Sequence, residues 1–154
     1  MSSDDIDTRP GWMGVLARSE PRGLAAAVEA LWAELGGAPE ATDLRAPQTG
    51  LAMARGRAGA TGSAFNLGEV PATRCALRLA DGTVGIAYAL GRDRAHARRA
   101  ALCDALMQTA QAATVRRIVL APLAAAEADR AARRAARAAA TRVEFFTLVR
   151  GEDG

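Results

Sequence analysis

The chain has 154 residues, the size of one compact domain, and 50% of them are hydrophobic, although 39 of these are alanine. Aromatic residues make up 4%, and the net charge of +3 comes from 20 arginines with no lysine. The lack of a long apolar run excludes a membrane span, and the acidic start excludes a signal peptide. The single histidine excludes a multi-histidine metal site. We therefore expect a cytoplasmic protein whose thin core depends on partner chains.

Two short helices are predicted after a flexible N-terminus over residues 1–9. Thr8 followed by Pro10 is typical of a helix cap and first turn, and the helix beginning there carries Trp12 on its apolar side. A second helix begins at Pro21 in the same way. Its apolar residues recur at helical spacing before a glycine pair ends it: Leu24, Val28, Leu31, Trp32, Leu35, then Gly36 and Gly37.

From residue 42 to residue 90 the hydrophobic period changes to two, which predicts an antiparallel β-meander with one buried face. Cys75, Leu77 and Leu79 alternate with polar or small residues in one strand. The dipeptide Asp81-Gly82 then indicates a two-residue hairpin. We assign the buried face of the returning strand to its large apolar residues: Val84, Ile86, Tyr88 and Leu90.

The C-terminal half is predicted to be mainly helical. Asp93 caps a long central helix of about five turns, and an alanine-rich helix opens at Pro122 and runs to about residue 140. Short strands are expected over residues 115–120 and, at the C-terminus, 143–150. The order of elements predicts a single α+β domain over residues 10–150, with flexible residues 151–154.

A glycine-dense segment is the first candidate binding site. Glycines let the backbone approach an anion closely, and arginines supply positive charge. The segment lacks the Gly-Lys-Ser/Thr ending of a phosphate-binding loop and precedes a strand, so a flexible hairpin loop or a partner contact explains it as well. Its candidate residues are Arg55, Arg57, Gly59 and Gly62.

The start of the central helix is the second candidate. Arginines crowd its first turns, where the helix dipole disfavours cations. A bound anion or an acidic partner surface would offset this conflict, and a solvated basic helix start is the plainer alternative. We assign Arg92 and Arg94 to an anion or interface site. His96 is a further candidate but lacks a placed carboxylate, and Glu69 is the one acid worth following.

No catalytic triad, paired carboxylates or metal-ligand spacing is evident, so we assign no catalytic residue. Cys75 and Cys103 are interpreted as buried free thiols. Nucleic-acid binding lacks an aromatic platform or a reader motif. The residues alone leave open a free-standing anion or nucleotide-binding module that uses its arginine clusters. The alanine-rich helix also carries an arginine ridge typical of a solvated face: Arg130, Arg133, Arg134 and Arg137.

A set of short motifs stands in a characteristic order from about residue 10 to the C-terminus. It includes Trp12-Met13, Thr49-Gly50-Leu51, Phe65-Asn66-Leu67-Gly68-Glu69, Thr73-Arg74-Cys75, Gly91-Arg92-Asp93, Asp104-Ala105-Leu106 and Phe145-Phe146-Thr147. This ordered set resembles the PhnG family, the small subunits of the bacterial carbon–phosphorus lyase core complex. The sequence departs from the family pattern at Gln48, Ala60 and Arg98.

The resemblance implies an accessory subunit of a hetero-oligomer. Its partners would be a larger nucleosidase-like core subunit, the other core subunits and an ATPase-like subunit. Together such subunits displace adenine from ATP with methylphosphonate, which gives alpha-D-ribose 1-methylphosphonate 5-triphosphate. The resemblance assigns no catalytic residue, metal or cofactor to this chain, and ATP and the phosphonate are substrates of the whole complex. We expect no contact with membranes or nucleic acid.

Overall fold

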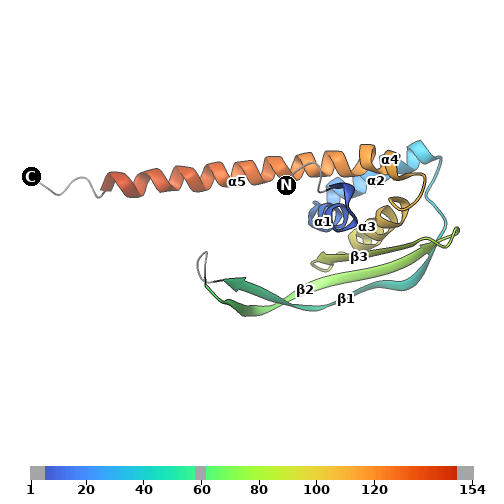
Figure 1. The fold of residues 1–154 in the computed structure, drawn as a ribbon, viewed down its shortest axis with the longest axis horizontal. Helices are drawn as coiled ribbons and strands as arrows, with labels where there is room; N and C mark the ends of the chain where they lie inside the picture. Colours follow the sequence, from blue (N-terminus) through green and yellow to red (C-terminus); the bar gives the residue numbers. More distant parts are fainter. Residues whose placement is uncertain (1–5, 58–61, 149–154) are drawn as a thin grey trace, which may run out of the picture.

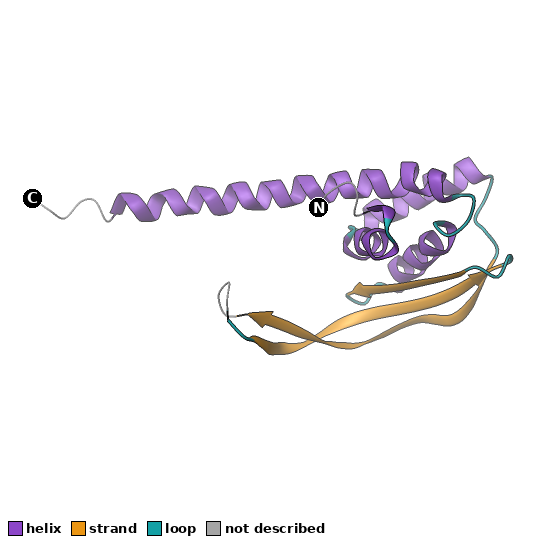
Figure 2. Cartoon of the chain, viewed as in Figure 1, coloured by secondary structure: helices purple, strands orange, loops and turns teal. Residues whose placement is uncertain are grey.

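The protein is an antiparallel three-stranded sheet with helices packed on one face, as a computed structural model shows (Figures 1 and 2). The structure describes residues 6–57 and 62–148, with the backbone alone for residues 141–148. Of the flexible ends expected from the sequence, residues 1–5 and 151–154 lie outside the described residues. The elements are α1 Arg9–Arg18, α2 Pro21–Leu35, β1 Ala41–Arg57, β2 Ala64–Leu79, β3 Val84–Leu90, α3 Arg94–Leu106, α4 Ala112–Val115, the π-helix η2 Arg116–Leu120 and α5 Ala121–Leu148.

The two N-terminal helices are confirmed, and their caps explain where they begin and end. The hydroxyl of Thr8 accepts a hydrogen bond from the backbone N–H of Gly11 at 3.3 Å, which satisfies one free donor of α1. Helix α2 begins at Pro21 and ends where Gly36 adopts a φ of 79°, a conformation that favours glycine.

The antiparallel meander is also confirmed, in the order β1-β2-β3. Strands β2 and β3 meet in a hairpin at the predicted position, but the expected two-residue loop is wrong, because residues 80–83 separate the strands. The carboxylate of Asp81 accepts from the backbone N–H of Thr83 at 2.8 Å, and Gly82 has a φ of 91°. The short strand expected around Phe65 is part of β2, whose 16 residues pair with the 17 residues of β1. Both strands extend well beyond β3 (Figure 1).

The predicted buried face of β3 is wrong. Its large residues point away from the helices, and Gly85, Ala87 and Ala89 face the core instead. A Cβ atom on Gly85 would lie 2.0 Å from the carbonyl oxygen of Ala101 and 2.7 Å from the Cβ of Ala105. Helix α3 therefore packs so close to β3 that only very small side chains fit between them. The size of the side chains, and not their hydrophobicity, decides which face of β3 is buried.

The two strands predicted in the C-terminal half are also wrong, because these segments are helical. Residues 115–120 form the end of α4 and the π-helix η2, with Val115, Val119 and Leu120 buried on one helical side. Residues 143–148 continue α5, and residues 149–150 lie outside the described residues. The high helix propensity of the alanine-rich stretch carries α5 past its expected end. Helix α3 is shorter than predicted, with 13 residues.

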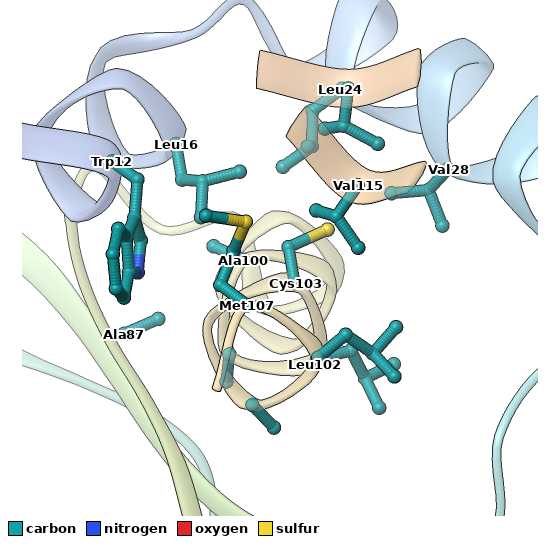
Figure 3. Close-up of a cluster of buried hydrophobic side chains, with 14 of the residues drawn as sticks. Trp12, Leu16, Leu24, Val28, Ala87, Ala100, Leu102, Cys103, Met107 and Val115 are labelled. Carbon is teal, nitrogen blue, oxygen red and sulfur yellow. The ribbon is translucent and has the colours of Figure 1, made fainter. Parts of the chain in front are cut away.

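The core lies between the helices and the inner face of the sheet. Figure 3 shows Trp12 and Leu16 of α1 and Leu24 of α2 around Cys103 of α3. Few of its members are bulky, because much of α3 and β3 contributes alanine. The largest fully buried apolar side chains are Leu16, Leu24, Leu31, Leu77, Leu120, Val15, Val28, Val115 and Val119. Tight contacts between small residues thus replace aromatic bulk.

Two arms project from this body in the same direction (Figure 1). The helical arm is α5 from residue 131 onward, where every side chain up to residue 140 is exposed. Its base is held by Arg18, whose Nε donates to Glu127 at 2.6 Å. The hairpin arm consists of residues 51–57 of β1 and 64–70 of β2, which extend past β3. Among the described residues, none of the helices combines the length and hydrophobicity needed to cross a membrane.

Candidate binding surfaces

A buried carboxylate joins three elements at the centre of the molecule. Asp104 of α3 is 0% exposed. Its Oδ1 accepts from Nε1 of Trp12 at 2.9 Å, and its Oδ2 accepts from the backbone N–H of Ile86 at 2.9 Å. Arg9 adds two hydrogen bonds, from Nε at 3.1 Å and Nη2 at 2.7 Å. With four donors around it, this carboxylate holds α1, α3 and β3 together and has no lone pair to spare for chemistry.

The sequence did not identify this network. Trp12 and Asp104 are 92 residues apart, and only the fold brings them together. A tryptophan near the start of a helix did carry a signal, because a buried indole N–H needs an acceptor. Which acid supplies that acceptor is a property of the tertiary structure. Both residues belong to motifs that carry the family resemblance. The network shows what these two residues do in the structure, which is to hold α1 against α3.

His96 lies inside the molecule, not in a site. The residue is 4% exposed, and Nε2 lies 3.0 Å from the carbonyl oxygen of Leu16. The backbone N–H of His96 donates to the carboxylate of Asp93 at 2.8 Å, which is the predicted cap of α3. Burial lowers the pKa of His96 below its ordinary value, so the ring is neutral at pH 7. The histidine ties α3 to α1 and is not placed for proton transfer to a ligand.

The two thiols are free and buried, as predicted. Burial raises the pKa of Cys103 to about 12, and the nearby charge of Asp104 adds to the effect. Burial also raises the pKa of Cys75, with a smaller contribution from Asp43. A thiol that stays protonated at neutral pH is a poor nucleophile, so neither cysteine suits covalent catalysis. The described residues also contain no group of histidine, cysteine and acidic side chains that would hold a metal ion.

Arg92 and Arg94 do share a site. A shallow pocket of about 490 Å³ lies beside the turn that leads from β3 into α3. Both arginines are exposed, and neither forms an ion pair with an acidic side chain among the described residues. The pocket is lined by Thr49, Gly50, Leu51, Pro71, Arg92 and Arg94.

The other candidate residues lie on the hairpin arm. Arg55 pairs with Asn66 across the two strands, and Glu69 pairs with Met53. Arg57 is the last residue of β1, Gly62 precedes β2, and Gly59 lies outside the described residues. Arg55 is four residues beyond the pocket residue Leu51, which corresponds to about 13 Å along a strand. The structure therefore does not bring the two arginine pairs into one site.

The sheet carries an uncovered apolar surface. We call the face opposite the helices the outer sheet face, and on β3 it exposes Val84, Ile86, Tyr88 and Leu90, the last at 74%. Further large apolar side chains are exposed on the other two strands. Soluble proteins rarely leave large contiguous apolar patches in water, and such patches mark interaction sites. The exposed large apolar residues on β1 and β2 are Leu44, Leu51, Met53, Phe65 and Leu67. Leu51 and Met53 share the sheet face of buried Thr73, so they lie on the helix side and do not extend the outer sheet face.

Comparison with known proteins agrees with the motifs. A family model described as phosphonate metabolism protein PhnG matches residues 7–151. A protein of Rhizobium meliloti (strain 1021) is 42% identical over 154 residues, which covers 99% of this chain and 96% of the relative. That relative is named alpha-D-ribose 1-methylphosphonate 5-triphosphate synthase subunit PhnG. The chain therefore belongs to the PhnG family of phosphonate metabolism proteins.

Proposed function

We propose that this chain is a subunit of an alpha-D-ribose 1-methylphosphonate 5-triphosphate synthase and that it serves assembly, not catalysis. Membership of the family and the relative that matches its full length support the first part. The uncovered outer sheet face is the observation that carries the second part. In the reaction, an oxygen of methylphosphonate replaces adenine at the anomeric carbon of ATP, and the triphosphate stays on the ribose.

The side chains of this chain support a role outside the chemical step. A nucleophile or general base has to be both reactive and accessible to the substrate. The two cysteines and His96 are buried, and the carboxylate of Asp104 is saturated by its four donors. We assign adenine displacement to the larger nucleosidase-like subunit. ATP and the phosphonate are substrates of the complex, and this chain brings no cofactor of its own.

The strip of large residues on β3 is too small to hold a partner alone. Full burial of a valine, leucine or isoleucine side chain stabilises by about 1.5–3 kcal/mol. Four side chains that are already partly covered then offer roughly 3–6 kcal/mol. Two proteins lose about 4–15 kcal/mol of translational and rotational freedom when they associate. We therefore include the apolar residues of the hairpin arm in the docking surface.

The arms also indicate the charge of the partner. The hairpin arm ends in Arg55 and Arg57, and an arginine ridge lies at the base of the helical arm, where Arg133 pairs with Asp129 at 2.8 Å. Both arms carry more basic than acidic residues, which disfavours binding of one arm to the other. We propose that the partner presents acidic groups to the arms and apolar groups to the outer sheet face. The larger nucleosidase-like core subunit is the first candidate, with the other core subunits and an ATPase-like subunit as further members.

We place the complex in the cytoplasm. Two buried thiols remain free in the structure, which suits a reducing compartment. The phosphonate and ATP consumed in the reaction would both be present there.

Co-purification with the larger core subunit tests the assembly role. The wild-type chain is expected to co-elute with that subunit, and a variant with Ile86→Glu and Tyr88→Glu is expected to elute separately, because two charges are placed on the outer sheet face. Ala26→Glu, on the exposed side of α2, is the matched control and keeps the interaction. Circular dichroism verifies that all variants are folded. Unchanged co-elution of the double variant would exclude the outer sheet face as the docking surface.

A further inference from the structure

We infer that the pocket beside Arg92 and Arg94 binds a phosphorus oxyanion, either a phosphate chain or a phosphonate. The choice of ligand rests on the proposed function, because both anions occur in the synthase reaction. The pocket itself rests on the geometry alone. Its volume of about 490 Å³ falls within the range of roughly 300–1,000 Å³ that small-molecule sites occupy.

The two guanidinium groups supply the attraction. Arg92 and Arg94 are two residues apart at the turn into α3, and both contribute to the lining of the pocket. Their planar forks donate paired hydrogen bonds to phosphate oxygens, which a lysine ammonium does not. Neither arginine is neutralised by an acidic side chain within the described residues. The pocket therefore has two positive charges available.

Among the described residues, no carboxylate forms an ion pair with either arginine. Asp93 stands between them and lowers the local positive charge, but its carboxylate accepts the backbone N–H of His96 at 2.8 Å and bonds neither guanidinium. Asp43 pairs with Arg98 at 3.2 Å. Glu69 is exposed on β2, two residues from Pro71, and does not line the pocket. At the start of α3 the Asp93 cap satisfies the N–H of His96, and we assign the attraction to the two arginines.

Hydrogen bonds hold the base of the pocket in place. The backbone N–H of Gly91 donates to the carbonyl oxygen of Pro71 at 2.8 Å, and the hydroxyl of Thr73 donates to the carbonyl oxygen of Gly91 at 2.8 Å. The hydroxyls of Thr49 and Thr73 lie 3.0 Å apart. This chain of contacts fixes the turn that carries the arginines against β1 and β2. A site fixed before binding loses less entropy when an anion enters.

Gly50 lines the pocket through its backbone, between Thr49 and Leu51 on β1. The neighbouring hydroxyl of Thr49 adds a polar group to a lining that Leu51 and Pro71 otherwise make apolar. A methylphosphonate presents both kinds of surface, and a phosphate chain presents the charged kind alone.

The test uses the assembled complex that contains the full chain. Isothermal titration calorimetry measures the binding of inorganic tripolyphosphate and, separately, of methylphosphonate. Three forms of the chain are compared with the wild type: Arg92→Ala with Arg94→Ala, Arg92→Lys with Arg94→Lys, and the control Arg22→Ala. Arg22 is exposed on α2 and does not line the pocket. The double alanine variant is expected to raise the Kd by about tenfold or more, which is about 1.4 kcal/mol or more, because both guanidinium groups that attract the anion are removed.

The outcomes distinguish a phosphate ligand from a phosphonate ligand, and failure of the pocket from failure of the proposed function. Weaker binding of tripolyphosphate alone assigns the pocket to a phosphate chain, and weaker binding of methylphosphonate alone assigns it to the phosphonate. An intermediate loss in the lysine variant supports recognition by the arginine forks. Unchanged binding of both probes overturns the anion site. A double alanine variant that keeps its helix content but no longer assembles also overturns it, since the arginines then contact partner carboxylates. If the wild-type chain does not assemble, the proposed function fails, and titrating this chain alone still tests the pocket.

Discussion

Replacing Asp104 by alanine tests the internal network most sharply. The change removes the acceptor of the buried indole N–H of Trp12 and of the partly buried backbone N–H of Ile86. Each buried donor left without a partner costs about 1–3 kcal/mol. Arg9 adds little because its side chain is 40% exposed and water screens its charge. We expect the free energy of unfolding to fall by about 3–5 kcal/mol, in line with other broken buried pairs.

Urea unfolding of the purified chain, followed by tryptophan fluorescence and far-ultraviolet circular dichroism, measures this loss. A domain of this kind has roughly 5–15 kcal/mol of total stability, so the Asp104→Ala variant should unfold at much lower urea. Asp129→Ala is the matched control, because Asp129 is exposed and pairs with Arg133 on the surface of α5. Its effect is expected to stay below about 0.5 kcal/mol. A loss at Asp104 as small as that of the control would refute the role assigned to the network.

Three further predictions follow from buried positions. Gly85→Ala should destabilise the chain by about 1–3 kcal/mol in the same unfolding assay, because the added Cβ would collide with α3. In the control Gly23→Ala the added Cβ has only an ordinary contact at 3.6 Å. Equal stability of the two variants would contradict the close packing of β3 against α3. Burial lowers the pKa of His96, so the unfolded chain takes up a proton more readily, and stability should fall as the pH drops below about 6.5. The unfolding midpoint of the wild-type chain should be lower at pH 5.5 than at pH 7.5, and this difference should be smaller in His96→Gln. An identical pH dependence in the two chains would contradict the burial of this ring. Cys103, with its pKa raised to about 12, should not react with a thiol reagent at pH 8 until urea unfolds the chain, and rapid labelling of the folded protein would contradict its burial.

Local signals in the sequence predicted most element boundaries. The caps at Thr8 and Asp93, the left-handed Gly36 and the hairpin at Asp81-Gly82 all depend on a few neighbouring residues, and all are found in the structure. The α+β class followed from the order of these elements. Such features are predictable because the atoms that make them lie close together in the chain.

Features set by distant residues were not predictable. The direction of β3 depends on how closely α3 approaches Gly85, and hydrophobic alternation alone favoured the opposite face. The strand expected over residues 143–150 was wrong for a local reason instead, because the helix formed by the preceding alanines continues through residue 148. At β3 the surrounding structure overrode local preference.

The candidate site shows the same division. Crowded arginines at the start of α3 were visible in the sequence, but the pocket they line includes Thr49 and Pro71 from two other strands. The hairpin arginines looked similar in the sequence and belong to a different surface. The outer sheet face was missed because the large residues of β3 were assigned to the core. Their exposure is what now points to a partner.

Hydroxyl-radical footprinting of the chain, alone and within its complex, tests the central claim most directly. The account predicts that the peptide containing Ile86, Tyr88 and Leu90 is oxidised readily in the isolated chain and is protected in the complex. A peptide from the exposed side of α2 should be oxidised equally in both. If the β3 peptide is oxidised to the same extent in the complex as in the isolated chain, the outer sheet face is not the surface through which this subunit assembles.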